Sequence, residues 1–178
     1  MVIYFLRHAN AGPKHFSDPV KDERRPIDKI GEAQSHDVGR ALAAIGVTVN
    51  VIISSPLTRA MQTAAIVSQE IGHEEKLVLD DALRPEATVE RFKALLHRHK
   101  DKAAIMVVGH DPSMTDFVNG VLSSGSPLAA VELKKAGVAK VEKELRRPAV
   151  LRWCMPPKVV QRIQHSSAKR SRPKTDLK

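Results

Sequence analysis

The stretch from Val2 to Asn10, VIYFLRHAN, consists of five apolar residues followed directly by an arginine and a histidine. A short apolar run rich in β-branched and aromatic residues predicts a buried β-strand. Arg7 and His8 would then lie at the carboxyl edge of a sheet, which is where open α/β sheets bind ligands. The opening of the chain therefore predicts a buried strand with a site at its end.

Further apolar runs predict strands of the same kind. Residues 49–55 (VNVIISS) and 103–110 (AAIMVVGH) are strong candidates, and residues 76–83 (KLVLDDAL) are a weaker one. Helical spacing separates these runs. A first helix is expected from about Glu32 to a stop at Gly46, and a second one has Pro56 in its first turn. A third is expected after a cap at Thr88, and a fourth has Asp111 as its cap and Pro112 in its first turn.

This alternation predicts a three-layer α/β sandwich, in which a mostly parallel sheet carries helices on both faces. The stretch at 137–156 (GVAKVEKELRRPAVLRWCMP) alternates like an antiparallel hairpin, which we expect at one edge of the sheet. Residues 11–31 are crowded with Gly, Pro, Asp and charged residues, which predicts a long irregular loop. A loop of this length is usually functional or mobile, and we expect it to border the site.

Length and composition favour one domain over residues 1–157. The chain has 178 residues, of which 42% are hydrophobic and 28% charged, enough for a substantial core. No run approaches the roughly 18 apolar residues of a bilayer span, and the first strand is too short for a signal peptide. We therefore expect a cytoplasmic protein without a membrane partner. The single cysteine, Cys154, excludes a disulfide within the chain and a cysteine-rich metal site.

The net charge of +9 is concentrated at the carboxyl end. Residues 158–178 contain seven basic residues against one acid, Asp176, so the first 157 residues carry a net charge of only +3. This basic segment, residues 158–178, lacks apolar periodicity, and we expect it to be a tail that is disordered after about Ile163. It could attract an acidic surface or RNA, but without stacking aromatic residues or a recognisable module a nucleic-acid partner is disfavoured.

Each strong strand ends in polar or charged residues that could share one site. Arg7 and His8 follow the first strand, Arg59 lies one helical turn beyond the second, and His110 ends the third. Because carboxyl ends of parallel strands meet at one edge, these four side chains would form a cationic pocket. Arginine forks match phosphate oxygens, and a neutral histidine can attack phosphorus and carry it covalently. The natural guest is a phosphoryl group.

Each residue also has a plainer interpretation. Taken singly, either arginine could be a surface or salt-bridged cation, and either histidine a hydrogen-bonded structural residue. Only their combination favours a site. Neither a P-loop nor an HExxH zinc motif is present, so no metal or nucleotide cofactor is expected.

At these residues the sequence resembles the histidine phosphatase superfamily, and especially its small SixA-like phosphohistidine phosphatase branch, with a phosphoglycerate mutase-like fold. The resemblance lies in LRHA at 6–9, SSPLTRAMQTA at 54–64, VVGHDPSM at 107–114 and RRPID at 24–28, in the family's order. It implies that His8 is a nucleophile that forms a phosphohistidine intermediate. Arg7, Arg59 and His110 would be the other members of the catalytic phosphate pocket, and the family uses no metal for this step.

The sequence departs from the family pattern at Ala9, where R-H-G is usual. If that position needs a positive φ, alanine would cost about 1 kcal/mol of strain. The general acid that many members take from the segment before the third strand would be Glu86, with Asp80 and Asp81 as poorer candidates, and all three could be solvated loop acids. Asn10 and Arg25 are weaker candidates for substrate contacts.

The resemblance and the short spacing between Arg59 and His110 favour an uncapped pocket and a protein substrate. We expect hydrolysis of a phosphohistidine-bearing protein, for instance a histidine-phosphotransfer protein. Two alternatives stay open: a phosphatase of small phosphomonoesters, such as sugar phosphates or nucleotides, and a phosphate-binding module without turnover.

Overall fold

The computed structural model describes residues 1–123, 131–144 and 146–170, with side chains described as far as residue 164. Its centre is a six-stranded sheet in the order β3-β2-β4-β1-β5-β6. The four strands at one side run parallel and comprise β1 (Val2–Arg7), β2 (Val51–Ser54), β3 (Val78–Leu79) and β4 (Ala104–Gly109). The antiparallel edge comprises β5 (Val138–Glu142) and β6 (Val150–Met155). The predicted strands and edge hairpin are confirmed.

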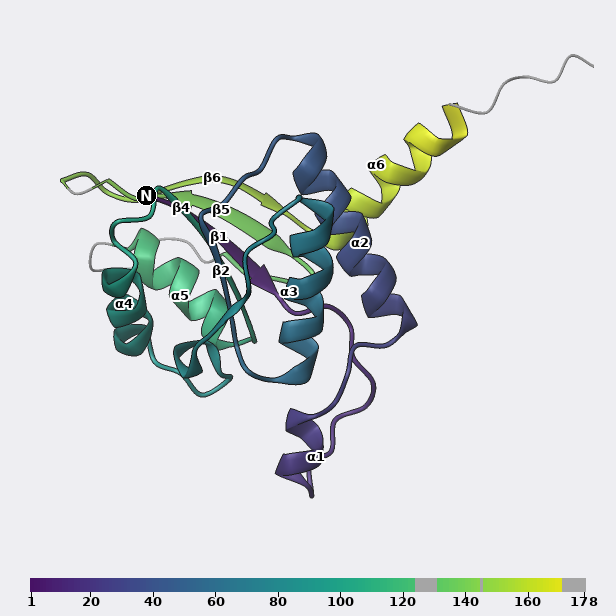
Figure 1. The fold of residues 1–178 in the computed structure, drawn as a ribbon, viewed down its shortest axis with the longest axis horizontal. Helices are drawn as coiled ribbons and strands as arrows, with labels where there is room; N and C mark the ends of the chain where they lie inside the picture. Colours follow the sequence, from purple (N-terminus) through teal and green to yellow (C-terminus); the bar gives the residue numbers. More distant parts are fainter. Residues whose placement is uncertain (124–130, 145, 171–178) are drawn as a thin grey trace, which may run out of the picture.

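Helices cover both faces of this sheet (Figure 1). Alternate residues of β1 face opposite ways, so Ile3 and Phe5 contribute to one core cluster and Tyr4 and Leu6 to the other. The first cluster includes apolar residues of α4 (Val89–Arg98) and α5 (Ser113–Leu122). The second includes residues of α2 (Lys29–Ala44), α3 (Thr58–Glu70) and α6 (Pro157–Arg170). The three-layer α/β sandwich is therefore confirmed.

Several local predictions about turns and caps hold. Gly46 ends α2 with φ near 70°, a conformation that glycine adopts without strain. The Thr88 side chain accepts a hydrogen bond from the backbone of Arg91 and so caps α4. Phe92, on the buried face of that helix, stacks on Phe117 with ring centroids 4.4 Å apart. These contacts tie α4 to α5 beneath the sheet.

Other helix starts differ from the sequence prediction. Helix α3 begins at Thr58, two residues beyond Pro56, and α5 begins at Ser113. The carboxylate of Asp111 does not cap α5, because it accepts a hydrogen bond from Thr115 and pairs with Arg7. The loop predicted to be irregular contains a five-residue helix, α1 (Pro19–Glu23), which the Asp18 side chain caps. A single turn of this length leaves no apolar periodicity to detect.

The basic segment is helical beyond Ile163, where a disordered tail was expected to begin. Residues 158–170 belong to α6 rather than to an irregular tail, while residues 171–178 lie outside the described part of the chain. Val160 is 2% exposed and packs in the cluster with α2, so burial of one apolar side chain anchors the start of this helix. No helix among the described residues is long and apolar enough to span a membrane.

Candidate active site

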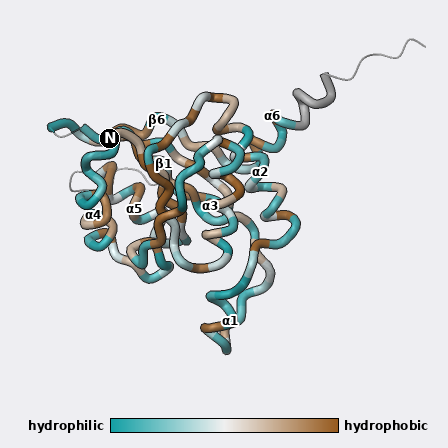
Figure 2. Tube along the Cα trace, in the orientation of Figure 1, coloured by the Kyte–Doolittle hydropathy of each residue, from teal (hydrophilic) through white to brown (hydrophobic). Residues whose placement is uncertain are grey.

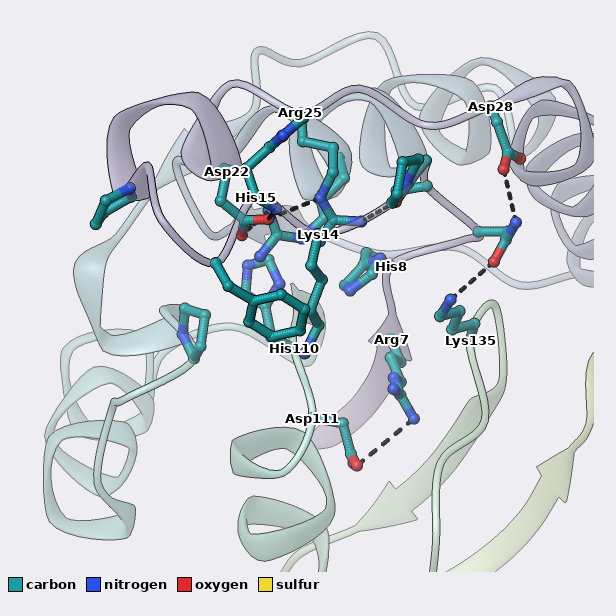
Figure 3. A pocket seen from close by; sticks show the side chains of 18 residues that line it. Arg7, His8, Lys14, His15, Asp22, Arg25, Asp28, His110, Asp111 and Lys135 are labelled. Carbon is teal, nitrogen blue, oxygen red and sulfur yellow. Dashed lines mark hydrogen bonds and ion pairs between the residues drawn. The ribbon is translucent and has the colours of Figure 1, made fainter.

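A cavity of about 750 Å³ lies at the carboxyl ends of β1 and β4 (Figure 3). It gathers all six residues that the sequence singles out: Arg7, His8, Asn10, Arg25, Arg59 and His110. Residues not predicted for the site also line it, and they include Gly12, Lys14, His15, Phe16, Pro19, Asp22, Asp28, Pro85, Asp111 and Lys135. The parallel register explains the convergence, because Arg7 pairs with Gly109 and so brings the ends of the two strands together.

His8 is held as a neutral imidazole with a defined tautomer. Its backbone N–H donates to the carbonyl of Gly109 (2.9 Å), and its Nδ1 lies 2.7 Å from the carbonyl oxygen of Ala9. A carbonyl oxygen can only accept, so Nδ1 carries the proton and Nε2 keeps a lone pair. Burial and the positive charges of Arg59 and Arg7 lower the pKa of His8 to about 3. The lone pair is therefore available at neutral pH.

His110 faces His8 across the cavity, with ring centroids 5.0 Å apart. Its Nε2 lies 2.8 Å from Oγ of Ser55, a residue from the loop after β2. Burial, with the nearby His8 and Arg59, lowers the pKa of His110 to about 2. This second imidazole is therefore also neutral at neutral pH. The negative charge of a bound phosphate would favour its protonation.

Three arginines surround the histidines, and each is held by backbone carbonyls. Arg7 donates to the carbonyl of Leu133 (2.7 Å) and lies 3.5 Å from the Asp111 carboxylate. Arg59, in the first turn of α3, donates to the carbonyl of Asp22 (2.9 Å), and Arg25 donates to that of Gly12 (2.6 Å). Because the carbonyls fix these guanidinium groups, they form a preorganised cationic site for an anion.

Buried polar atoms without partners also indicate an anionic guest. Among the described residues, four buried side-chain nitrogens make no hydrogen bond: Nε of Arg7, Nε of Arg59 and Nδ1 of His110 belong to lining residues of the cavity, and Nε2 of His73 does not. An unpaired buried donor normally costs about 1–3 kcal/mol, which is why most such groups find a partner. Phosphoryl oxygens are negatively charged hydrogen-bond acceptors, so a bound phosphoryl group would supply partners for the nitrogens of the lining residues.

Asp22 organises two of the arginines and was not predicted from the sequence. Its carboxylate accepts from Nε of Arg25 (2.9 Å) and from the backbone of His15 (3.2 Å), and it lies 3.5 Å from Arg59. Partial burial acts to raise the pKa of Asp22, but the His15 N–H and Arg25 outweigh it, and the pKa is lowered. The only sequence signal was its spacing of three from Arg25.

Asn10 braces the pocket wall with both ends of its amide. Its Nδ2 donates to Asp28 (2.7 Å), and its Oδ1 accepts from the ammonium of Lys135 (2.8 Å). The start of α2 packs so closely here that a Cβ on Gly31 would lie 2.0 Å from the carbonyl oxygen of Asn10. Both ends of the Asn10 amide therefore already have protein partners, and the predicted substrate contact of Asn10 competes with this structural role.

The acid candidates of the segment after β3 do not reach the cavity. Glu86 is exposed and does not line the cavity, although its neighbour Pro85 does. Asp80 pairs with Arg98 and caps the turn at Ala82, while Asp81 pairs with Arg84 (2.7 Å). The carboxylates that do line the cavity are Asp22, Asp28 and Asp111, and each is already bonded to a neighbouring group.

Ala9 fits its position without strain. It is fully buried, its φ is not positive, and its backbone N–H donates to Oγ1 of Thr63 (3.0 Å). The departure from R-H-G is therefore compatible with the pocket geometry. Within residues 1–123, 131–144 and 146–164, no group of three His, Cys, Asp or Glu side chains is arranged to hold a metal ion.

Comparison with known structures places this fold. The chain superposes on the protein histidine phosphatase SixA in complex with tungstate with a TM-score of 0.78, at 22% identity over 89% of this chain and 98% of that one. A putative α-ribazole-5′-P phosphatase from Escherichia coli gives a TM-score of 0.67 at 16% identity, over 85% of this chain and 94% of that one. Both likenesses support the phosphoglycerate mutase-like α/β fold.

Comparison of sequences identifies the family. An uncharacterised protein of Picosynechococcus sp. is 31% identical over 141 residues, which cover 78% of this chain and 82% of that protein. The model of the histidine phosphatase superfamily (branch 1) matches residues 3–87, a range that includes Arg7, His8, Arg25 and Arg59. The cationic pocket at the ends of β1 and β4 thus belongs to a member of the histidine phosphatase superfamily, with a SixA-like fold.

Proposed function

We propose that this protein is a phosphatase that hydrolyses phosphohistidine on another protein through a covalent intermediate on His8. The contact between Nδ1 of His8 and the carbonyl oxygen of Ala9 is the observation that carries the proposal. The Nδ1–H of His8 is bound to that carbonyl, so the Nε2 lone pair belongs to a fixed ring in a cationic pocket. A site for phosphate binding alone has no need for such a nucleophile.

The first step transfers the phosphoryl group to His8. Nε2 attacks phosphorus and a new N–P bond forms, while the P–N bond to the substrate imidazole breaks and that nitrogen takes a proton from solvent. The guanidinium groups of Arg7, Arg25 and Arg59 neutralise the phosphoryl oxygens as their charge shifts. His110 hydrogen-bonds the transferring group.

The second step regenerates the enzyme. Water attacks phosphorus, the bond to Nε2 breaks, and inorganic phosphate leaves as the water proton passes to solvent. The lone pair returns to Nε2, and the Ala9 carbonyl restores the same tautomer. Both steps use the same arginines, because the phosphorus stays between them.

The substrate class is argued from the carboxylates of the pocket. Among the described lining residues, every carboxylate already accepts a hydrogen bond from a side chain of the protein. Arg25 donates to Asp22, Asn10 to Asp28, and Thr115 to Asp111. An alkoxide leaving group needs proton donation, whereas a P–N bond has a better leaving group. This favours phosphohistidine. Small phosphomonoesters remain the second candidate, since the fold is shared with a putative α-ribazole-5′-P phosphatase.

The test compares two substrates without added metal. Phosphate release would be measured from a phosphohistidine-labelled protein and from p-nitrophenyl phosphate, for the parent protein and for His8→Ala, with inorganic phosphate binding as a check on the pocket. We expect preference for the phosphohistidine protein, its loss in His8→Ala, and an acid-labile phosphoryl group on the parent chain alone.

Other outcomes would change the proposal. Faster turnover of the ester would support the small-molecule alternative. Equal phosphate release by the parent protein and His8→Ala would show that His8 is not the nucleophile. Binding of inorganic phosphate without turnover of either substrate would indicate a phosphate-binding module.

A further inference from the structure

Two large apolar side chains beside the pocket are exposed to solvent. Phe16 is 89% exposed although it lines the cavity, and Val20 is 61% exposed on α1. Pro19 lies between them in sequence and also lines the cavity. Helix α1 projects away from the body of the molecule, and hydrophobic residues appear at its otherwise hydrophilic tip (Figures 1 and 2). We call Phe16, Pro19 and Val20 the apolar rim.

Polar contacts hold the segment that carries the apolar rim. Asp22 binds Arg25 and lies near Arg59, and Glu23 pairs with Arg84 (2.7 Å) on the segment that follows β3. No residue of α1 is buried. The acids of α1 thus hold it to the phosphate-binding arginines, while its apolar side chains remain in solvent.

We propose that the apolar rim is the docking surface for the protein that carries the phosphorylated histidine. This inference rests on the proposed function. Isolated exposed apolar residues are ordinary, but Phe16 and Pro19 line the cavity that would hold the phosphoryl group, and Val20 directly follows Pro19 in α1. A substrate small enough to fit inside the cavity would not contact Val20, which does not line it. A protein surface around a phosphorylated side chain would.

The chemistry of the rim defines the partner. Lys14 lies over the ring of Phe16, 5.8 Å from its centroid, and Lys135 lines the same cavity. The rim therefore fits an apolar patch that is flanked by acidic side chains, next to the phosphorylated histidine. Once a partner covers it, an exposed aromatic side chain such as Phe16 can become a buried anchor of the interface.

The experiment compares the specificity constants of two substrates. For Phe16→Gln and Val20→Gln, kcat/KM would be measured with the phosphohistidine protein and with p-nitrophenyl phosphate. We expect kcat/KM for the phosphohistidine protein, divided by kcat/KM for p-nitrophenyl phosphate, to fall about tenfold in Phe16→Gln and about threefold in Val20→Gln. The fall should come mainly from a higher KM for the phosphohistidine protein. Ester hydrolysis by Val20→Gln should equal that of the parent.

Ile45→Gln is the matched control, since Ile45 is 57% exposed beyond the end of α2 and does not line the cavity. It should leave the ratio unchanged. An unchanged ratio in both rim variants would overturn the docking surface while leaving the proposed function intact. A parent protein that does not hydrolyse the phosphohistidine substrate would overturn both.

Discussion

The two buried histidines should make the stability of the free protein strongly dependent on pH. His8 is 7% exposed and His110 is 2% exposed, and their pKa values are lowered to about 3 and about 2. In the unfolded chain the pKa of each histidine is about 6.5. Between these limits the unfolded chain binds more protons than the folded one, so stability falls as the pH falls below 6.5.

The size of the effect follows from linkage. Between pH 7 and pH 5, protonation of the unfolded chain lowers the free energy of unfolding by about 2 kcal/mol for each histidine that stays neutral in the fold, or roughly 4 kcal/mol for the pair. That is a large part of the usual 5–15 kcal/mol of a domain. The lowered pKa of Asp22 also removes stability on acidification, but mainly below pH 4.

Urea unfolding at pH 7 and pH 5 would measure this effect through the fluorescence of Trp153, the single tryptophan, which contacts Tyr4 of the sheet. The loss of stability should shrink by about half in His8→Gln, because glutamine does not titrate. His97→Gln, at an exposed position on α4, should keep the full loss. If His8→Gln loses as much stability as the parent, His8 is not held neutral and the argument for its lone pair fails.

Four substitutions test other parts of the site and fold. Arg59→Met should weaken inorganic phosphate binding by about 10- to 100-fold in calorimetry, because the charge-assisted bonds of a buried guanidinium are lost. Glu86→Gln should keep turnover of an alkyl phosphomonoester, whose alkoxide leaving group needs a proton donor, within about twofold, and a loss of about tenfold or more would contradict the placement of Glu86 outside the cavity. Ala9→Gly should lower the free energy of unfolding by about 0.5–1 kcal/mol without raising activity, since φ is not positive there; a gain in activity would contradict this. Val160→Ala should cost roughly 1–2 kcal/mol in urea unfolding if α6 is anchored by this side chain, and no change would mean that it is not.

The parallel core and four residues of the site could be predicted because they depend on local pattern. Continuous apolar runs indicate strands buried on both faces, and in a parallel sheet the residue after each strand falls at the same edge. Arg7, His8 and His110 follow directly from this rule, and Arg59 from the start of the next helix. The antiparallel edge of β5 and β6 was likewise visible as alternation.

The contributions of the loop depended on contacts that sequence spacing does not encode. Asp22 lies on a five-residue helix without a buried residue, and one hydrogen bond and one ion pair join it to Arg59, 37 residues away in the sequence. Lys135 reaches Asn10 from the segment before β5, which lies 125 residues away. Glu86 was a candidate by its position in the chain, yet its side chain is exposed outside the cavity.

The sequence by itself determined the layered α/β fold and the cationic cluster at the strand ends, because burial periodicity and strand direction are local properties. Only the tertiary structure decided which atoms are free to react. The neutral state of His8 depends on burial and on Arg59 and Arg7, and its tautomer on the carbonyl of Ala9. Electrostatics and hydrogen bonding of this kind act through space, between groups that the sequence separates by tens of residues.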